Sequence, residues 1–90
     1  MDRSARVVDC RGVASRAENL NEAFGRVLRQ LRTAAGVSQE DFAHQCDLHR
    51  TYISMLERGL KSPSLTTLKA IADALGVRAH DLVRRAEDVQ

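Results

Sequence analysis

The 90-residue sequence has few of the residues that build large cores or covalently braced folds. Aromatic side chains make up only 3% of it, and it contains one proline and two cysteines. The core of so short a chain supplies roughly 3–5 kcal/mol of net stability, which is too little to carry a deep substrate cavity. Most large enzyme folds are therefore excluded, and we expect a functional site on the surface.

The two cysteines, Cys10 and Cys46, are far apart and form no CxxC pair. This spacing favours free thiols in a reducing compartment over a disulfide or metal framework. No segment approaches the roughly 20 consecutive apolar residues that span a bilayer, and charged residues interrupt the N-terminal segment where a secretory signal would be apolar. We expect a cytoplasmic protein without a membrane partner.

The formal net charge of +2 is too small to indicate a polyanionic partner by itself. Its distribution is more informative. Residues 24–69 hold seven basic and four acidic side chains, whereas residues 70–90 hold three basic and four acidic ones. The positive excess therefore lies in the middle of the chain.

The periodicity of apolar residues predicts an all-α fold. Residues 1–19 show no sustained period and are interpreted as an N-terminal arm that could hold a further strand or helical turn. From Asn21 onward, apolar residues recur at the spacing of one helical face, and Gly36 supplies a terminator. The first helix is predicted at about 21–35, on Phe24, Val27, Leu28 and Leu31.

Four more helices follow at close intervals. A capping box at Ser38 and Asp41 predicts a helix at about 39–45, and the next apolar pattern predicts one at about 49–58. Only Asp47 and Leu48 separate Cys46, the last apolar residue of the first pattern, from the next helix, so the two helices must cross steeply. Two further helices are predicted after Ser64 and near 79–86. The expected architecture is a compact five-helix bundle over 20–86, followed by a tail at 87–90.

The segment GVSQEDFAHQCDLHRTYISMLERG, residues 36–59, resembles the helix-turn-helix of the lambda Cro/CI-like (XRE) family of DNA-binding proteins. The part LHRTYISMLERG is similar to controller proteins of bacterial restriction-modification systems and to related phage regulators. The resemblance covers roughly residues 24–83. It implies a lambda repressor-like fold and binding to double-stranded DNA.

The third predicted helix has the side chains that major-groove reading requires. Ile53 and Leu56 face inward, whereas Arg50 can donate two hydrogen bonds to guanine and Thr51 can contact a thymine methyl group. The predicted base-contacting residues are Arg50, Thr51, Tyr52 and Met55.

Other residues are predicted to contact phosphates. Gln39 matches the family position that donates to a phosphate, and Arg58, Lys61 and Ser62 match the loop that lies along the sugar-phosphate backbone. The predicted phosphate-contacting residues are Gln39, His49, Ser54, Arg58, Lys61 and Ser62.

Glu57 would repel phosphate unless it were turned away and neutralised. The family pairs this glutamate with an arginine of the first helix, and Arg32 occupies the matching position, so the resemblance implies a structural Arg32–Glu57 ion pair. Two residues depart from the family pattern. Asp47 stands where many members have glycine in the turn, and His49 is a poor helix N-cap.

The C-terminal part has more apolar residues than so small a core obviously needs. Family members of this length often dimerise through the last helix, and a two-fold dimer would place two recognition helices one turn of DNA apart, about 34 Å. The residues predicted at a dimer interface are Leu75, Val77, Leu82 and Val83, which could instead close the core of a single chain.

Three other functions are weaker on the sequence. His44, Cys46 and His49 invite a zinc hypothesis, but helical geometry points His44 and Cys46 in different directions. We expect neither a metal nor another cofactor. A Cys/His nucleophile fails on the same geometry, so an enzyme is not expected. The main alternative is an antitoxin-like module whose principal, unidentified partner is a protein.

Overall fold

The computed structural model describes residues 10–90, and within them the chain forms five helices and no strand. The helices are α2 (Cys10–Ala34), α3 (Gln39–Cys46), α4 (Arg50–Glu57), α5 (Leu65–Leu75) and α6 (Ala79–Val89). This confirms the predicted all-α class and the order of its helices. Side chains are described from Asn19 onward, and the first half of the predicted arm, residues 1–9, lies outside the described residues.

The predicted start of the first helix is wrong by about three turns. The sequence predicted an arm up to residue 19, but α2 already begins at Cys10. The segment lacks an apolar period, yet it contains alanine, arginine and glutamate and no proline, so its intrinsic helix propensity is favourable. Intrinsic helix propensity therefore accounts for the early start of α2. The single glycine, Gly12, does not stop the helix.

The predicted end of the last helix is also wrong. The sequence predicted that it ends near residue 86 and that a tail follows, but α6 continues to Val89. Ala86 is fully buried and Val89 is partly exposed. The final turn therefore extends beyond the last strongly buried position, which the apolar pattern cannot reveal.

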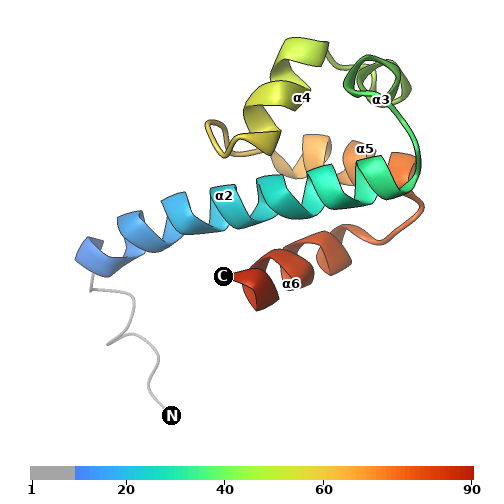
Figure 1. The fold of residues 1–90 in the computed structure, drawn as a ribbon. Helices are drawn as coiled ribbons and strands as arrows, with labels where there is room; N and C mark the ends of the chain where they lie inside the picture. The colour runs from blue at the N-terminus through green and yellow to red at the C-terminus, as the bar shows by residue number, and fades with distance from the viewer. Residues whose placement is uncertain (1–9) are drawn as a thin grey trace.

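The long helix α2 lies between the other elements (Figure 1). α4 packs on one side of it and α6 on the other, while α3 contacts α4 and α5, and α5 contacts α6. The largest fully buried side chains come from all five helices: Leu28, Phe42, Ile53, Leu56, Ile71 and Leu82. Every helix therefore contributes to one shared core, and none of the described helices is long and apolar enough to cross a membrane.

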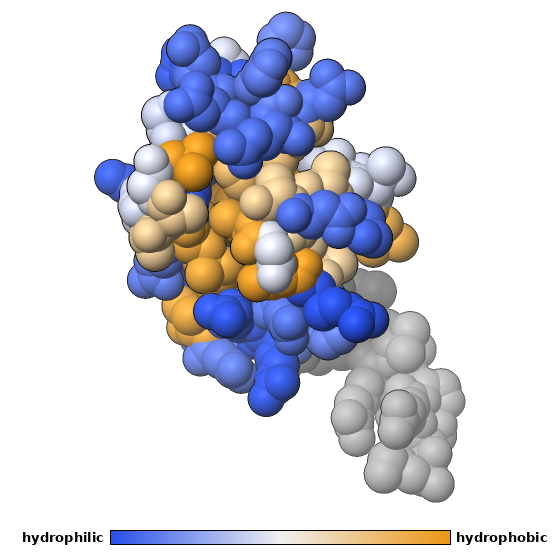
Figure 2. Space-filling view, turned by 90° about the vertical axis from the view of Figure 1, so that its right-hand side faces the viewer, coloured by the Kyte–Doolittle hydropathy of each residue, from blue (hydrophilic) through white to orange (hydrophobic). Residues whose placement is uncertain are grey.

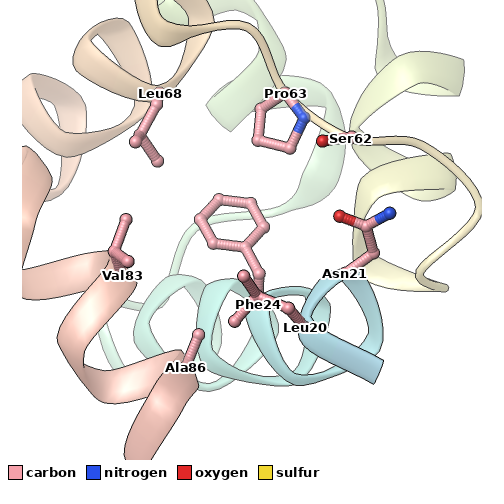
Figure 3. Close-up of a pocket in the computed structure, with 8 residues that line it drawn as sticks. All are labelled: Leu20, Asn21, Phe24, Ser62, Pro63, Leu68, Val83 and Ala86. Atoms are coloured by element: carbon pink, nitrogen blue, oxygen red, sulfur yellow. The ribbon is translucent and has the colours of Figure 1, made fainter. Parts of the chain in front are cut away.

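A small apolar hollow of about 150 Å³ remains where α2, α5, α6 and the α4–α5 loop meet. The ring of Phe24 points into it from α2, with Leu68 and Val83 on one side and Pro63 on the other (Figure 3). Leu20, Asn21, Ser62 and Ala86 complete its wall.

Gly25 is required where α2 crosses the end of α4. A Cβ atom at this position would lie 2.5 Å from the carbonyl oxygens of both Leu56 and Glu57. These oxygens belong to the backbone, so they cannot move aside as a flexible side chain could. The absence of a side chain at Gly25 therefore fixes how closely α4 can approach α2.

We expect Gly25→Ala to destabilise the fold by about 1–3 kcal/mol because α4 must shift. The sign is diagnostic, since alanine in a freely exposed helix position stabilises by about 1 kcal/mol over glycine. Thr33→Ala, at an exposed position of the same helix, is the control and should change stability by about 0.5 kcal/mol or less. Urea unfolding measures both, and a more stable Gly25→Ala would contradict the close approach.

Candidate nucleic-acid interface

Helix α3 begins at a conventional cap. The Ser38 hydroxyl accepts a hydrogen bond from the amide of Asp41 at 3.1 Å, as the capping box predicted. Glu40 and Asp41 in the first turn also suit the positive end of the helix dipole. Phe42, Ala43 and Cys46 are buried, so the helix is held by one face.

The turn between α3 and α4 depends on a left-handed residue. Asp47 has φ 59° and ψ 44°, and it is the only non-glycine residue with positive φ in the described chain. The amide of Leu48 donates to the carbonyl of Ala43 at 2.8 Å, which closes a Schellman-type turn. Asp47 therefore adopts the left-handed conformation at the position where many members of the resembled family have glycine.

Helix α4 is anchored from inside and open on its outer face. Ile53 and Leu56 are completely buried. Arg50 and Thr51 in the first turn are exposed. Tyr52, Ser54 and Met55 are half-buried, and the Tyr52 ring packs partly against the core. The outer face of α4 thus presents polar side chains from its N-terminal end.

His49 is the N-cap of α4 but makes no side-chain capping hydrogen bond. This agrees with the expectation that an imidazole caps poorly. His49 is exposed beside Arg50 in a polar hollow between α3 and α4. Its imidazole is therefore not used to stabilise the helix.

Positive charge continues after α4. Arg58 and Lys61 are exposed, and the Arg58 Nε atom donates to the carbonyl of Ser54 at 3.4 Å. Ser62 is exposed at the rim of the apolar hollow, near Asn21 (Figure 3). Ser62 therefore lies in the α4–α5 loop, close to α2. The sequence did not suggest this proximity.

The implied Arg32–Glu57 ion pair is present. The Arg32 Nε atom lies 2.5 Å from one Glu57 carboxylate oxygen, and its Nη2 atom lies 3.1 Å from the other. The side chains are only 10% and 4% exposed. Arg32 also donates from Nη1 to the carbonyl of Val37 at 2.7 Å. The acid at the end of α4 is thus neutralised and turned away from solvent.

A third residue joins this pair, and the sequence did not reveal it. The Gln39 Nε2 atom donates to a Glu57 carboxylate oxygen at 3.0 Å, so the predicted phosphate ligand already has a protein partner. The two residues are 18 positions apart, and no spacing rule connects the start of α3 with the end of α4. Only the steep crossing of the two helices could have indicated this contact.

The residues of the zinc hypothesis have separate environments. His44 is exposed, whereas Cys46 is buried with its thiol toward the carbonyl of Ala70. Burial raises the pKa of the Cys46 thiol, which keeps it protonated and unreactive. Among the side chains that the structure describes, from Asn19 onward, no group of three potential ligands is close enough to hold a metal ion.

One residue of the predicted dimer interface is placed in the core. Leu82 has no exposed area, and its helix α6 packs against both α2 and α5. It is therefore unavailable to a second subunit, and its assignment to an interface is corrected. Leu75, Val77 and Val83 are half-buried.

Leu65 is more exposed than its position on the helical face of α5 would suggest. It shares a helical face with the core residue Ala72, but it is 84% exposed. The two residues are seven positions apart, about 10 Å along the helix axis, so Leu65 lies beyond the end of the core. It forms part of the rim of an apolar groove. The groove is also lined by Leu68, Ala79, His80, Val83, Arg84 and Glu87.

Apolar surface also gathers at the end of the molecule where α2 and α5 stop. Figure 2 faces this end and shows a hydrophobic band between hydrophilic regions above and below it. The half-buried apolar residues of these helix ends include Val37, Leu75 and Val77. This face is therefore less polar than the exposed turns of α3.

The arrangement of α3, its tight turn and α4 defines a helix-turn-helix. The sequence profile of the helix-turn-helix family matches residues 28–82, more than half of the chain. The chain belongs to this family.

Individual relatives narrow the comparison. The chain is 47% identical over 66 residues to the control protein C.BamHI of Bacillus amyloliquefaciens, covering 72% of this chain and 82% of that one. The structure matches the restriction-modification controller protein C.AhdI of Aeromonas hydrophila with a TM-score of 0.67 and 40% identity, covering 69% and 94% of the two chains. It also matches the controller protein C.Esp1396I, solved as a tetramer with its natural 35 base-pair operator, with a TM-score of 0.69, 28% identity and coverage of 78% and 92%.

We expect Arg32→Met to lower the free energy of unfolding by about 3 kcal/mol because it strands the Glu57 carboxylate in a buried site. Adding Glu57→Leu to the same chain should recover part of this loss, since no buried charge is then left unpaired. Thermal and urea unfolding of both variants test this. Independent, additive losses would show that the two side chains do not act as a pair.

Proposed function

We propose that this protein is a sequence-specific transcription regulator that binds double-stranded DNA as a homodimer on a palindromic or nearly palindromic operator. The observation that carries this proposal is the division of α4 into two faces. Ile53 and Leu56 lock its inner face, while Arg50 and Thr51 are exposed at its N-terminal end. A helix presented in this way can enter the major groove with its first turn toward the bases.

Base reading is assigned to four residues. Arg50 donates two hydrogen bonds to guanine O6 and N7, and Thr51 contacts a thymine through its methyl group. Met55 and the exposed edge of Tyr52 add apolar contacts at neighbouring base steps. Arg50 has the leading role because it is exposed and has a bidentate donor geometry.

Phosphate contacts fix the register of α4 in the groove. Gln39 donates from the start of α3, His49 from the N-cap of α4, and Ser54 from within α4. Arg58, Lys61 and Ser62, in the segment after α4, contact the sugar-phosphate backbone of the DNA. Each phosphate neutralised by a basic side chain adds about −0.9 to the slope of log affinity against log salt.

The homodimer is assigned to the α5–α6 face. Leu65 projects from one copy beside the groove that contains Leu68 and Val83, and the adjoining apolar hollow shares these two residues. A protruding leucine next to an apolar recess is self-complementary under a two-fold axis, because each copy can fill the recess of the other.

Charges at the rim of this groove fit the same symmetry. Arg84 and Glu87 carry opposite charges one helical turn apart, and both are exposed. Across a two-fold axis, Arg84 of one copy can meet Glu87 of the other. Ala79 and His80 connect the groove to a neighbouring hollow that contains Val77, so the face can extend to Val77.

The relatives support this function. Their names describe control proteins and transcriptional regulators, and one solved relative is a tetramer on its operator. We therefore infer that the chain acts on a promoter in the cytoplasm, as repressor, activator or both, without enzymatic activity or a cofactor. An antitoxin-like module remains the alternative. Co-purification of a neighbouring gene product would favour it.

Arg50→Ala should weaken binding to a duplex selected from a random library by about 1–3 kcal/mol and relax base preference at one position of each half-site. Arg85→Ala is the matched control, because it removes the same charge from α6, on the far side of α2 from α4. It should leave base preference unchanged. Binding isotherms and repeated selection measure both effects, and unchanged preference in Arg50→Ala would refute the proposed readout.

Leu65→Asp should weaken self-association at least tenfold, because burying a carboxylate against an apolar groove is unfavourable. Thr66→Asp places the same charge on the next residue, which is also exposed, and should leave association intact. Sedimentation equilibrium measures the dimer constant of each variant. Equal dimer constants for the two variants would exclude this face as the interface.

A further inference from the structure

Glu57 lies where α2, α3 and α4 meet. Arg32 alone would neutralise its charge, yet Glu57 also contacts Gln39. One carboxylate oxygen accepts from Arg32 Nε, and the other accepts from both Arg32 Nη2 and Gln39 Nε2, at 3.1 and 3.0 Å. The Glu57 side chain is 4% exposed, so it cannot reach DNA itself. Gln39 is half-buried at the first position of α3, so part of its side chain remains accessible.

We propose that Glu57 is a positioning residue that sets the carboxamide of Gln39 for contact with a DNA phosphate. The inference rests on the proposed DNA-binding function. A carboxylate only accepts hydrogen bonds, so it requires the nitrogen of Gln39, not the carbonyl oxygen, on its side. It thereby decides which way a group with two nearly equivalent orientations is turned.

The orientation matters because phosphate oxygens are also acceptors. The Gln39 nitrogen has two N–H groups, and one is donated to Glu57. The side chain makes no other hydrogen bond within the described residues, so the second N–H is left for a phosphate. A freely rotating amide would also present its oxygen to the phosphate, which is repulsive.

Arg32 stabilises this arrangement through hydrogen bonds to Glu57 and to the segment before α3. It holds both carboxylate oxygens of Glu57 and the carbonyl of Val37, two residues before Gln39. The start of α3 and the end of α4 are therefore fixed to the same guanidinium group. The ion pair thus acts on DNA binding through Gln39.

A double-mutant cycle tests the proposal with Gln39→Ala, Glu57→Met and the combined variant. The probe is a duplex selected from a random library with the wild-type protein. Gln39→Ala should weaken binding about two- to tenfold, the range of one net hydrogen bond. Glu57→Met should weaken it by a similar factor, and the combined variant should bind no more weakly than either single one.

The direction of the affinity change in Glu57→Met separates a positioning role from a purely electrostatic one. Glu57→Met removes a negative charge, which by itself would strengthen binding to a polyanion. Gln45→Ala, at an exposed position near the other end of α3, is the matched control and should not change affinity. Stronger binding by Glu57→Met, or losses that multiply in the combined variant, would overturn the positioning role. Absence of duplex binding by the wild type would instead refute the proposed function.

Nuclear magnetic resonance of the wild-type protein tests the same point if Glu57→Met does not fold. The two side-chain amide protons of Gln39 should have well-separated resonances in the free protein, since only one is hydrogen-bonded to a carboxylate. Addition of the selected duplex should shift the other proton. No duplex-dependent change at the Gln39 amide would overturn the proposal.

Discussion

The buried ion pair between Arg32 and Glu57 is the interaction on which the interface depends. Helices α3 and α4 have eight residues each, far fewer than an isolated helix needs for stability in water. Their positions must therefore come from tertiary contacts. Ile53 and Leu56 supply the apolar part of that anchorage, while Glu57 ties the end of α4 to α2 and to the start of α3.

Burial of this pair also solves an electrostatic problem. In the proposed complex, an acid at the end of α4 would oppose binding to DNA, and its removal from water has its own energetic cost. Two contacts from the guanidinium of Arg32 and one from Gln39 satisfy the carboxylate. The same contacts fix the angle between α3 and α4, so neutralisation and alignment are achieved by one set of hydrogen bonds.

Most of the fold could be predicted from the sequence because its signals are local. Ser38 and Ser64 mark helix starts, and the left-handed residues Gly36 and Asp47 follow helix ends, as the structure reproduces. The start of α2 could not be predicted from periodicity, because the segment before Asn21 has no apolar period and favours a helix only through its intrinsic propensity. The burial of Leu82 and the exposure of Leu65 also escaped prediction, since the apolar spacing marks a helix face but not where along the helix the core ends.

The candidate site was predictable only in part, for a related reason. The outward residues of α4 follow from helical geometry and from the inward position of Ile53 and Leu56. The contact between Gln39 and Glu57 depends on the crossing of two helices, so no residue spacing encodes it. The side chains proposed to touch DNA could thus be inferred one at a time, whereas the hydrogen-bond network around Glu57 required the structure.

The small net charge of +2 fits this type of interface. Binding that relied on bulk attraction would neutralise many phosphates and would be strong on any sequence. Here the exposed cations of α4 and its following loop are few, and the exposed acids Glu40 and Asp41 stand at the start of α3. Weak non-specific attraction lowers competition from other sites, so the specificity ratio depends on oriented contacts. In the proposed complex, a positioned amide at Gln39 would contribute to affinity without adding charge, so its orientation would matter more than its electrostatic strength.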